Sequence, residues 1–198
     1  MQTLIFATGN PHKVEEVNQV LSDAWDLHSM AEWGITEDLP ENQDTLEGNA
    51  LEKARYVYEK LKLDCFAEDT GLEVEALHGE PGVYTARYAG DSKDPNANIQ
   101  KVLDKLAGAG NRRARFRTVI ALIIKGEEFL FEGIAPGTIQ MEKSGNGGFG
   151  YDPIFRPEGY LVSFAEMDAA TKNRISHRGQ AVRKLIAFLE ERASKTLH

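Results

Sequence analysis

Cysteine is almost absent from this sequence, and long apolar runs and an excess of basic residues are missing as well. Cys65 is the only cysteine among 198 residues, so the chain cannot form an internal disulfide and a reducing compartment is expected. No apolar run approaches the ~20 residues that a membrane span needs, and no signal peptide is recognisable before the first predicted strand. The sequence has 23 Lys and Arg residues against 31 Asp and Glu residues, so its formal net charge is −8. We therefore expect a cytoplasmic protein whose main partner is neither nucleic acid nor a membrane.

Apolar periodicity predicts an α/β fold in a single domain covering residues 1–198. Thr3–Thr8 is typical of a buried strand that ends at a Gly-Asn turn, and a helix is expected from Pro11, because proline suits a first helical turn. Two long strands flank Lys125-Gly126, which predicts a hairpin. An antiparallel hairpin excludes a purely parallel sheet, so we expect a mixed one.

Three finer assignments follow from local signals. A long amphipathic helix is predicted over 46–61, with Asp44 and Glu47 as its capping box. The stretch DCFAEDTGLEVEAL predicts a short strand, a turn at Gly71 and a second strand. The apolar stripe of 171–193 predicts one closing helix.

The stretch FATGNPHKVEEV predicts an anion-binding turn. Backbone N–H groups at the start of a helix lack partners and lie at the positive end of its dipole, so phosphate binds there readily. Lys13 adds a point charge at the same place, although its spacing differs from that of a Walker A loop. The alternative, at even weight, is an ordinary strand-to-helix turn.

The stretch FAEDTGLEV places two carboxylates, Glu68 and Asp69, at the end of a predicted strand. Adjacent residues of a strand point to opposite faces, so the two are not expected to act as one pair. We expect Asp69 to face the same cavity as the Gly9-Asn10 bend, with Mg²⁺ between them, because Mg²⁺ takes one or two carboxylates beside phosphate. Glu41 is a candidate second ligand. The alternative is a solvated acidic turn.

The segment GNGGFG has the spacing of a dinucleotide-binding loop, but a Rossmann loop must open a helix and YDPIF follows here. We therefore reject that interpretation. We hypothesise that this glycine loop presents the rings of Phe149 and Tyr151 for stacking on a base, and that Asp152 makes a polar contact with the base. A plain flexible loop is the alternative.

The segment KNRISHRGQA gathers Lys172, Arg174, His177 and Arg178. A helix start there could direct these side chains at one pocket. The default alternative is a solvated helix face, with His177 as a partly buried packing residue.

Five stretches, in this order and spacing, closely resemble the inosine-triphosphate pyrophosphatase family. They are TGNPHK, AEDTGLEVEAL, PGVYTARYAG, GGFGYDPIF and SHRGQA, and the match runs from residue 3 to about residue 190. The resemblance implies an elongated α/β structure, in which helices flank a long twisted mixed sheet and two lobes enclose an active-site cleft. It also implies a Mg²⁺-dependent enzyme, commonly a homodimer, that cuts ITP, dITP or XTP to the nucleoside monophosphate and pyrophosphate.

The same resemblance assigns roles to individual residues. Asp69 matches the general base and metal-side carboxylate, and Lys13 is the second catalytic candidate. Glu41 matches the other metal-binding acid, and no distinct role falls on Glu68. The positions that match the family's substrate contacts are Thr8, Gly9, Asn10, Pro11, His12, Lys13, Thr70, Phe149, Gly150, Tyr151, Asp152, Lys172, His177 and Arg178.

Two other functions compete with this expectation. A regulatory module that binds a purine nucleotide without hydrolysing it would keep Lys13 and the Phe149 loop but would not need Asp69 and Glu41. A Maf-like pyrophosphatase acting on modified pyrimidines is the second, and the stretches FGYDPIF and SHRGQA disfavour it.

Overall fold

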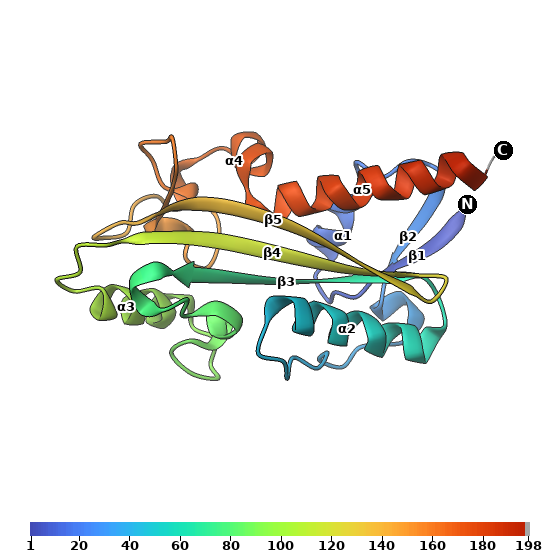
Figure 1. The fold of residues 1–198 in the computed structure, drawn as a ribbon, viewed down its shortest axis with the longest axis horizontal. Helices are drawn as coiled ribbons and strands as arrows, with labels where there is room; N and C mark the ends of the chain where they lie inside the picture. Colours follow the sequence, from blue (N-terminus) through green and yellow to red (C-terminus); the bar gives the residue numbers. More distant parts are fainter. Residues whose placement is uncertain (197–198) are drawn as a thin grey trace. The chain divides into compact units, whose positions relative to one another are not determined.

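The structure, a computed structural model, describes residues 1–196 and is built on one six-stranded mixed sheet (Figure 1). The strand order is β2-β1-β3-β4-β5-β6. The strands are β1 (Gln2–Phe6), β2 (Trp25–Ser29), β3 (Cys65–Val74), β4 (Arg113–Ile124), β5 (Glu127–Ile139) and β6 (Phe155–Pro157). The α-helices are α1 (Pro11–Asn18), α2 (Leu46–Leu61), α3 (Pro95–Lys105), α4 (Ala169–Ile175) and α5 (His177–Thr196).

Parallel and antiparallel neighbours both occur in the sheet, so the expected mixed α/β fold is confirmed. Strand β1 pairs in parallel with β2 and with β3, whereas β5 and β6 are antiparallel. The predicted hairpin is present, since β4 and β5 are neighbours joined only by Lys125 and Gly126. Both turn residues have positive φ, 51° and 82°, which matches the twist that a two-residue hairpin requires.

The chain forms two compact units. The first contains Met1–Asp69, Val119–Glu132 and the chain from Ala181, and the second contains Thr70–Thr118 and Gly133–Gln180. Strands β3, β4 and β5 each have residues in both units. Each unit has its own hydrophobic core.

The core of the first unit lies between the sheet and helices α1 and α5. Strand residues such as Leu4 and Phe66 pack there with Val17 of α1 and Leu185 of α5. Helix α2 lies on the other side of the strands (Figure 1), where its buried positions include Ala54.

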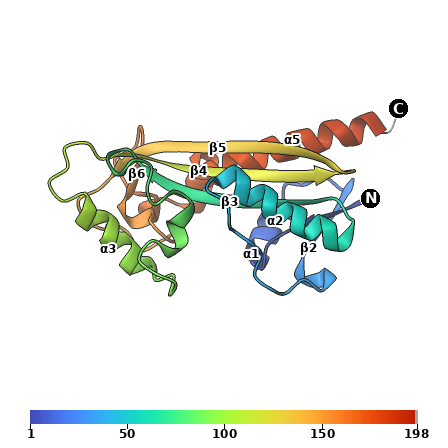
Figure 2. The ribbon, with the colours of Figure 1, turned by 60° about the horizontal axis from the view of Figure 1, so that its bottom comes forward.

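The core of the second unit packs its strands against helix α3 and the segments around β6. Leu72 and Phe116 from the strands pack with Ile99 and Val102 of helix α3 and with Phe164. Figure 2 shows α3 on one side of the strands and β6 beside β5. The outward residues of this part of the sheet are polar, and Arg113, Arg115 and Arg156 are examples.

Three local predictions were wrong in detail. The N-cap of α2 is Thr45, whose hydroxyl accepts from the N–H of Gly48, and not Asp44. Strand β3 runs through Gly71 without a turn, because residues on both sides of the glycine are buried in one core or the other. The closing helix is broken at Ser176, whose ψ of 152° is extended.

The described part of the chain, residues 1–196, contains no helix with the length and apolar character needed to cross a membrane.

Candidate active site

The turn between β1 and α1 is built as the sequence suggested. Asn10 is the N-cap of α1, and its side-chain oxygen accepts from the N–H of His12 at 3.0 Å. The hydroxyl of Thr8 accepts from the N–H of Asn10 at 3.2 Å, and Pro11 begins the helix. A Cβ on Gly9 would meet nothing within 4 Å, so the space above this turn is open.

Lys13 points from this turn to strand β3. Its ammonium lies 2.6 Å from Oε1 of Glu68, whose side chain is 5 % exposed. The contact follows from topology: β1 and β3 are parallel neighbours with Phe6 opposite Phe66, so the residues after β1 reach the same sheet edge as residue 68. The structure therefore brings Lys13 to Glu68, whereas Asp69, which was expected to share a cavity with the Gly9-Asn10 bend, contacts Lys53 instead. That shared cavity stays a prediction.

Asp69 belongs to a second ion cluster. The ammonium of Lys53, on α2, lies 3.2 Å from Oδ1 of Asp69 and 2.7 Å from Oε1 of Glu41. Burial raises the pKa of Asp69; attraction to Lys53 lowers that pKa, and repulsion from Glu41 raises it. The other carboxylate oxygen, Oδ2, is buried and has no hydrogen-bond partner among residues 1–196.

Glu68 and Asp69 thus pair with lysines from two different helices. Lys13 comes from α1 and Lys53 from α2. This division matches the alternation of side chains along a strand. The two carboxylates do not form one acid pair.

In the second unit, the glycine loop is organised around Asp152. Its carboxylate is buried, and Oδ2 accepts from the N–H of Phe149 at 2.9 Å and from the ammonium of Lys172 at 2.5 Å. That ammonium also lies 4.7 Å from the centre of the Phe149 ring. A Cβ on Gly148 would come 2.2 Å from Oδ2 of Asp152, which explains a glycine there. The structure therefore brings Lys172, from the KNRISHRGQA segment, to Phe149 and Asp152 of the glycine loop. The Phe149 ring is 71 % exposed.

Tyr151 differs from its expected role. Its ring belongs to the core of the second unit, and its hydroxyl donates to the carbonyl of Thr85 at 2.7 Å. Burial raises the pKa of this phenol. The expected stacking wall is therefore reduced to Phe149, because the Tyr151 ring would have to leave the core to reach a base. Gly150, between them, has a φ of 59° and open space around its Cβ position.

The other predicted site residues of the second unit, His177, Arg178 and Thr70, are buried or partly buried. His177 is buried with its ring stacked on Phe116, the centroids 4.7 Å apart, and Arg178 follows it in the first turn of α5. The hydroxyl of Thr70 shares a 2.7 Å hydrogen bond with that of the buried Thr118.

Comparison with known proteins places the chain in a family. The family model described as the Ham1 family matches residues 4–188. The chain belongs to the Ham1 family. The match covers most of the chain, and it confirms the resemblance drawn from the five sequence stretches.

Curated relatives of this Ham1 chain are named dITP/XTP pyrophosphatases. That of Porphyromonas gingivalis is 53 % identical over 190 residues, which are 96 % of this chain and 98 % of the relative. That of Bacillus subtilis is 45 % identical over 194 residues, 96 % of this chain and 98 % of the relative. Among solved structures, the Ham1 protein of Staphylococcus aureus superposes with a TM-score of 0.92 at 38 % identity, covering 96 % of this chain and all of that one.

The donors that the Ham1 chain offers decide how it could hold a metal ion. Within residues 1–196, no three His, Cys, Asp or Glu side chains are gathered into a cage for a metal ion. Mg²⁺ does not require one, since it is usually held by one or two carboxylates together with waters and substrate phosphates. The buried Oδ2 of Asp69, which lacks a donor, and the nearby carboxylate of Glu41 fit this mode.

Lys53 contacts two candidate site residues, Asp69 and Glu41, and the sequence analysis did not single it out. It occupies the buried face of α2 with Ala50, Ala54 and Val57, at spacings of three and four residues. A lysine on an apolar helix face is rarely buried without a partner. A lysine among the apolar positions of this helix, together with the carboxylates of β3, was the feature of the sequence from which this contact could have been predicted.

Proposed function

We propose that this protein hydrolyses non-standard purine nucleoside triphosphates (ITP, dITP and XTP) to the nucleoside monophosphate and pyrophosphate, and so removes them from the nucleotide pool. The names of its curated relatives support the substrate class. The observation that carries the proposal is the state of Asp69: one oxygen is held by Lys53 and the other is buried without a donor. A carboxylate in that state is suited to accept a proton.

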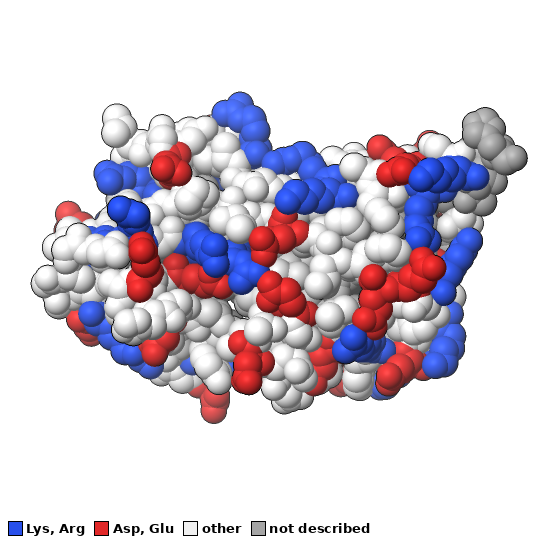
Figure 3. Space-filling view, viewed as in Figure 1, with Lys and Arg blue, Asp and Glu red and all other residues white. Residues whose placement is uncertain are grey.

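The triphosphate needs local positive charge, because the protein is acidic overall. Figure 3 shows basic and acidic side chains interspersed on the face drawn there. In the first unit, Lys13 and the start of α1 supply charge and N–H groups on one side of β3, and Lys53 supplies charge on the other. We assign the phosphates to these groups.

Asp69 is the proposed general base. A water attacks the α-phosphorus and gives its proton to Asp69; the new oxygen–phosphorus bond forms as the bond to the bridging oxygen breaks, and pyrophosphate leaves. Burial, which raises the pKa of Asp69, makes it a better proton acceptor. We also propose Mg²⁺, held by Glu41 and Asp69, which when bound would stabilise negative charge on the phosphates.

The second unit is proposed to recognise the base. The exposed ring of Phe149 offers a stacking surface, and Asp152 fixes the loop that carries it together with Lys172. Arg178 offers only donors. Hypoxanthine and xanthine have an acceptor at position six, whereas adenine has an amino donor there, so a donor at this site disfavours adenine.

Three further proposals complete the picture. The resemblance implies a two-lobed active site and a homodimer, the chain length predicts a single domain, and the single cysteine, Cys65, favours the cytoplasm. A non-hydrolysing binding module remains the alternative function.

One assay tests the proposed function. The protein is incubated with Mg²⁺ and, separately, with ITP, XTP, dITP, ATP and GTP, and the inorganic product is identified. Pyrophosphate from ITP, dITP and XTP is expected, with little from ATP and GTP. Release of orthophosphate, or nucleotide binding without any product, would contradict the proposal, and the second result would favour the regulatory module.

A further inference from the structure

Two threonines face each other between neighbouring strands of the second unit. The hydroxyl oxygens of Thr70, on β3, and Thr118, on β4, are 2.7 Å apart, and both residues belong to that unit. Thr118 is completely buried and begins a run of seven buried residues, Thr118–Ile124, in which it is the only polar one. Valine is β-branched in the same way, so what threonine adds at this position is its hydroxyl.

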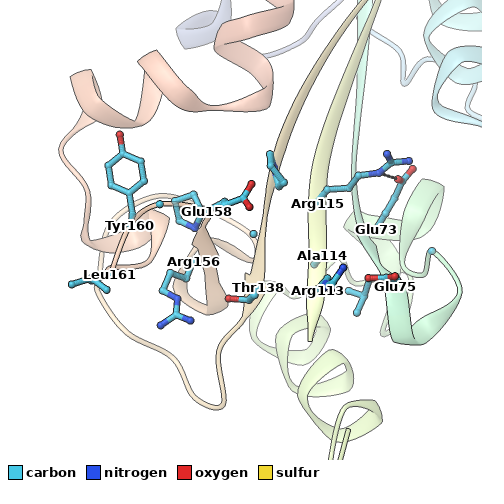
Figure 4. A pocket seen from close by; sticks show the side chains of 16 residues that line it. Glu73, Glu75, Arg113, Ala114, Arg115, Thr138, Arg156, Glu158, Tyr160 and Leu161 are labelled. Atoms are coloured by element: carbon cyan, nitrogen blue, oxygen red, sulfur yellow. Dashed lines mark hydrogen bonds and ion pairs between the residues drawn. The ribbon is translucent and has the colours of Figure 1, made fainter. Parts of the chain in front are cut away.

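The register of the two strands places these hydroxyls opposite each other. Glu73, three residues after Thr70 on β3, contacts Arg115 at 2.6 Å (Figure 4). Arg115 lies three residues before Thr118 on β4, so the two neighbouring strands are antiparallel. Because side chains alternate along a strand, the threonines share the face opposite to the Glu73–Arg115 pair. The next residue of β3 on that face, Leu72, belongs to the core of the unit.

The direction of the hydrogen bond between the threonines follows from burial. A hydroxyl has one hydrogen to donate and two lone pairs that accept. The side chain of Thr118 forms no other hydrogen bond with any of residues 1–196. If Thr70 were the donor, the hydrogen of Thr118 would be buried without an acceptor, which is costly. If Thr118 is the donor, no hydrogen is buried unpaired, because Thr70 is only partly buried. Thr118 therefore donates and Thr70 accepts.

Thr70 consequently keeps a hydrogen of its own to donate. Its side chain forms no second hydrogen bond within residues 1–196, and its O–H points away from Thr118, whose hydrogen occupies one of its lone pairs. Thr70 directly follows Asp69, the proposed general base, and the resemblance counts it among the substrate contacts. The phosphates of a nucleoside triphosphate offer anionic oxygens, which are strong acceptors for such a donor.

We infer that Thr118 is a positioning residue for the proposed reaction: it donates to Thr70 and so directs the Thr70 O–H at a phosphate oxygen of the substrate. The inference rests on the proposed function, because it concerns the same triphosphate. Thr118 is completely buried and touches no substrate itself. Its contribution is to fix in advance a hydroxyl that would otherwise rotate among several orientations.

The first experiment removes and restores the donor. Thr118→Val keeps the branched shape without the hydroxyl, and kcat/KM for ITP should fall about 2- to 10-fold, the usual range for one hydrogen bond. Thr118→Ser should recover most of the loss. Thr3→Val, at a strand threonine whose side chain forms no hydrogen bond with the rest of residues 1–196, is the matched control and should change nothing. Wild-type kcat/KM in Thr118→Val, or no recovery in Thr118→Ser, would overturn the inference. Thermal unfolding well above the assay temperature shows that each variant is folded.

The second experiment asks whether Thr118 acts through Thr70. Thr70→Val should lower kcat/KM for ITP by about 10- to 100-fold, because it removes a hydrogen bond to a charged oxygen. In that background Thr118→Val should cause no further loss, since the hydroxyl that it positions is already gone. An equal loss from Thr118→Val in both backgrounds would show that Thr118 acts only on the structure, and the inference would fall.

A binding measurement separates the inference from the proposed function. The probe is an ITP analogue with a methylene group in place of the oxygen between the α- and β-phosphates, which cannot be cleaved there. Its Kd, measured by calorimetry with Mg²⁺, should rise about 2- to 10-fold in Thr118→Val and recover in Thr118→Ser. A wild type that binds the analogue but releases no pyrophosphate from ITP would refute the proposed reaction, and the Kd values would still decide the inference. A Kd that is unchanged in Thr118→Val would overturn the inference, and a wild type that neither binds the analogue nor hydrolyses ITP would overturn both.

Discussion

The ammonium of Lys53 lies 3.2 Å from Oδ1 of Asp69, and this contact joins helix α2 to strand β3. Lys53 is almost completely buried, and it reaches Glu41 from the same position. Oδ1 of Asp69 is thus held by a cation, whereas the buried Oδ2 has no donor among residues 1–196. The arrangement holds the carboxylate in place without occupying the atom that the proposed reaction uses.

Asp69→Asn should lower kcat for ITP by about 10²–10⁴-fold, the usual contribution of a general base. The amide keeps the shape of the side chain but cannot accept the proton. Steady-state release of pyrophosphate measures the effect, and Asp23→Asn, at an exposed position, is the matched control. Near wild-type turnover in Asp69→Asn would remove this residue from the mechanism.

Lys53→Met should destabilise the protein by about 1–3 kcal/mol, because it leaves two carboxylates facing each other without a cation. The cost stays below that of a fully buried pair, since the Glu41 side chain is 42 % exposed. Urea unfolding measures it. The double variant Lys53→Met with Glu41→Gln should recover part of the loss, because one of the opposed charges is gone. Strictly additive losses would contradict the proposed coupling.

Local sequence patterns were sufficient to predict those elements whose structure is determined by residues close together in the sequence. The helix over 46–61 and the hairpin at Lys125-Gly126 follow from periodicity and turn chemistry, and both are present. At Gly71 and Ser176 the local signals gave the wrong answer. Strand β3 continues through Gly71 because distant segments bury the residues on either side of it, and a propensity for turns does not contain that information.

The break at Ser176 is accompanied by a close contact between α4 and α5. A Cβ on Gly179 would come 2.0 Å from the carbonyl oxygen of Asn173, so the last turn of α4 lies tightly against the first turn of α5. The apolar stripe alone does not reveal this contact. Lys13 could be singled out from the sequence because its motif suggests anion binding, and its role stays a prediction. Lys53 could not, because its contact with Asp69 requires knowing that α2 faces the end of β3.

Phe149→Ala should raise KM for ITP by about 5- to 100-fold, because stacking of a base on an aromatic ring is worth about 1–3 kcal/mol. Tyr151→Phe is the informative comparison. It removes the buried hydrogen bond to the carbonyl of Thr85 and should lower stability by about 1 kcal/mol while leaving KM unchanged. A rise of KM in Tyr151→Phe, measured by initial rates, would restore a direct substrate role to that side chain.

His28 should make stability depend on pH. Hydrogen bonds to Glu32 and then to Asp26 raise the pKa of His28 above 6.5 in the folded protein. The stabilisation is therefore complete below about pH 6.5, the ordinary value, and disappears as pH rises through the folded-state pKa. Its size is at most about 1 kcal/mol, because both carboxylates are largely exposed.

Thermal unfolding of the wild type and of His28→Gln tests this pH dependence. The difference in Tm should be present at about pH 5.5 and absent at about pH 9, on either side of the histidine titration. Glu32→Gln should also show a larger difference in Tm at about pH 5.5 than at about pH 9, but part of its loss should persist at the higher pH, because Glu32 also accepts from the N–H and the hydroxyl of Ser29. A difference in Tm that is equal at both pH values would contradict the assignment.

Arg178→Ala should narrow the preference for ITP over ATP. A guanidinium that donates to the acceptor at position six stabilises hypoxanthine by about 1.5–3 kcal/mol, the range for a hydrogen bond to a charged group, and faces the amino group of adenine as donor to donor. Loss of Arg178 should therefore lower kcat/KM for ITP by about 10- to 100-fold while that for ATP stays nearly constant. Arg174→Ala, at an exposed position on the preceding helix, is the matched control. If the ratio of the two kcat/KM values is the same in Arg178→Ala as in the wild type, discrimination between the bases depends on another group of the second unit.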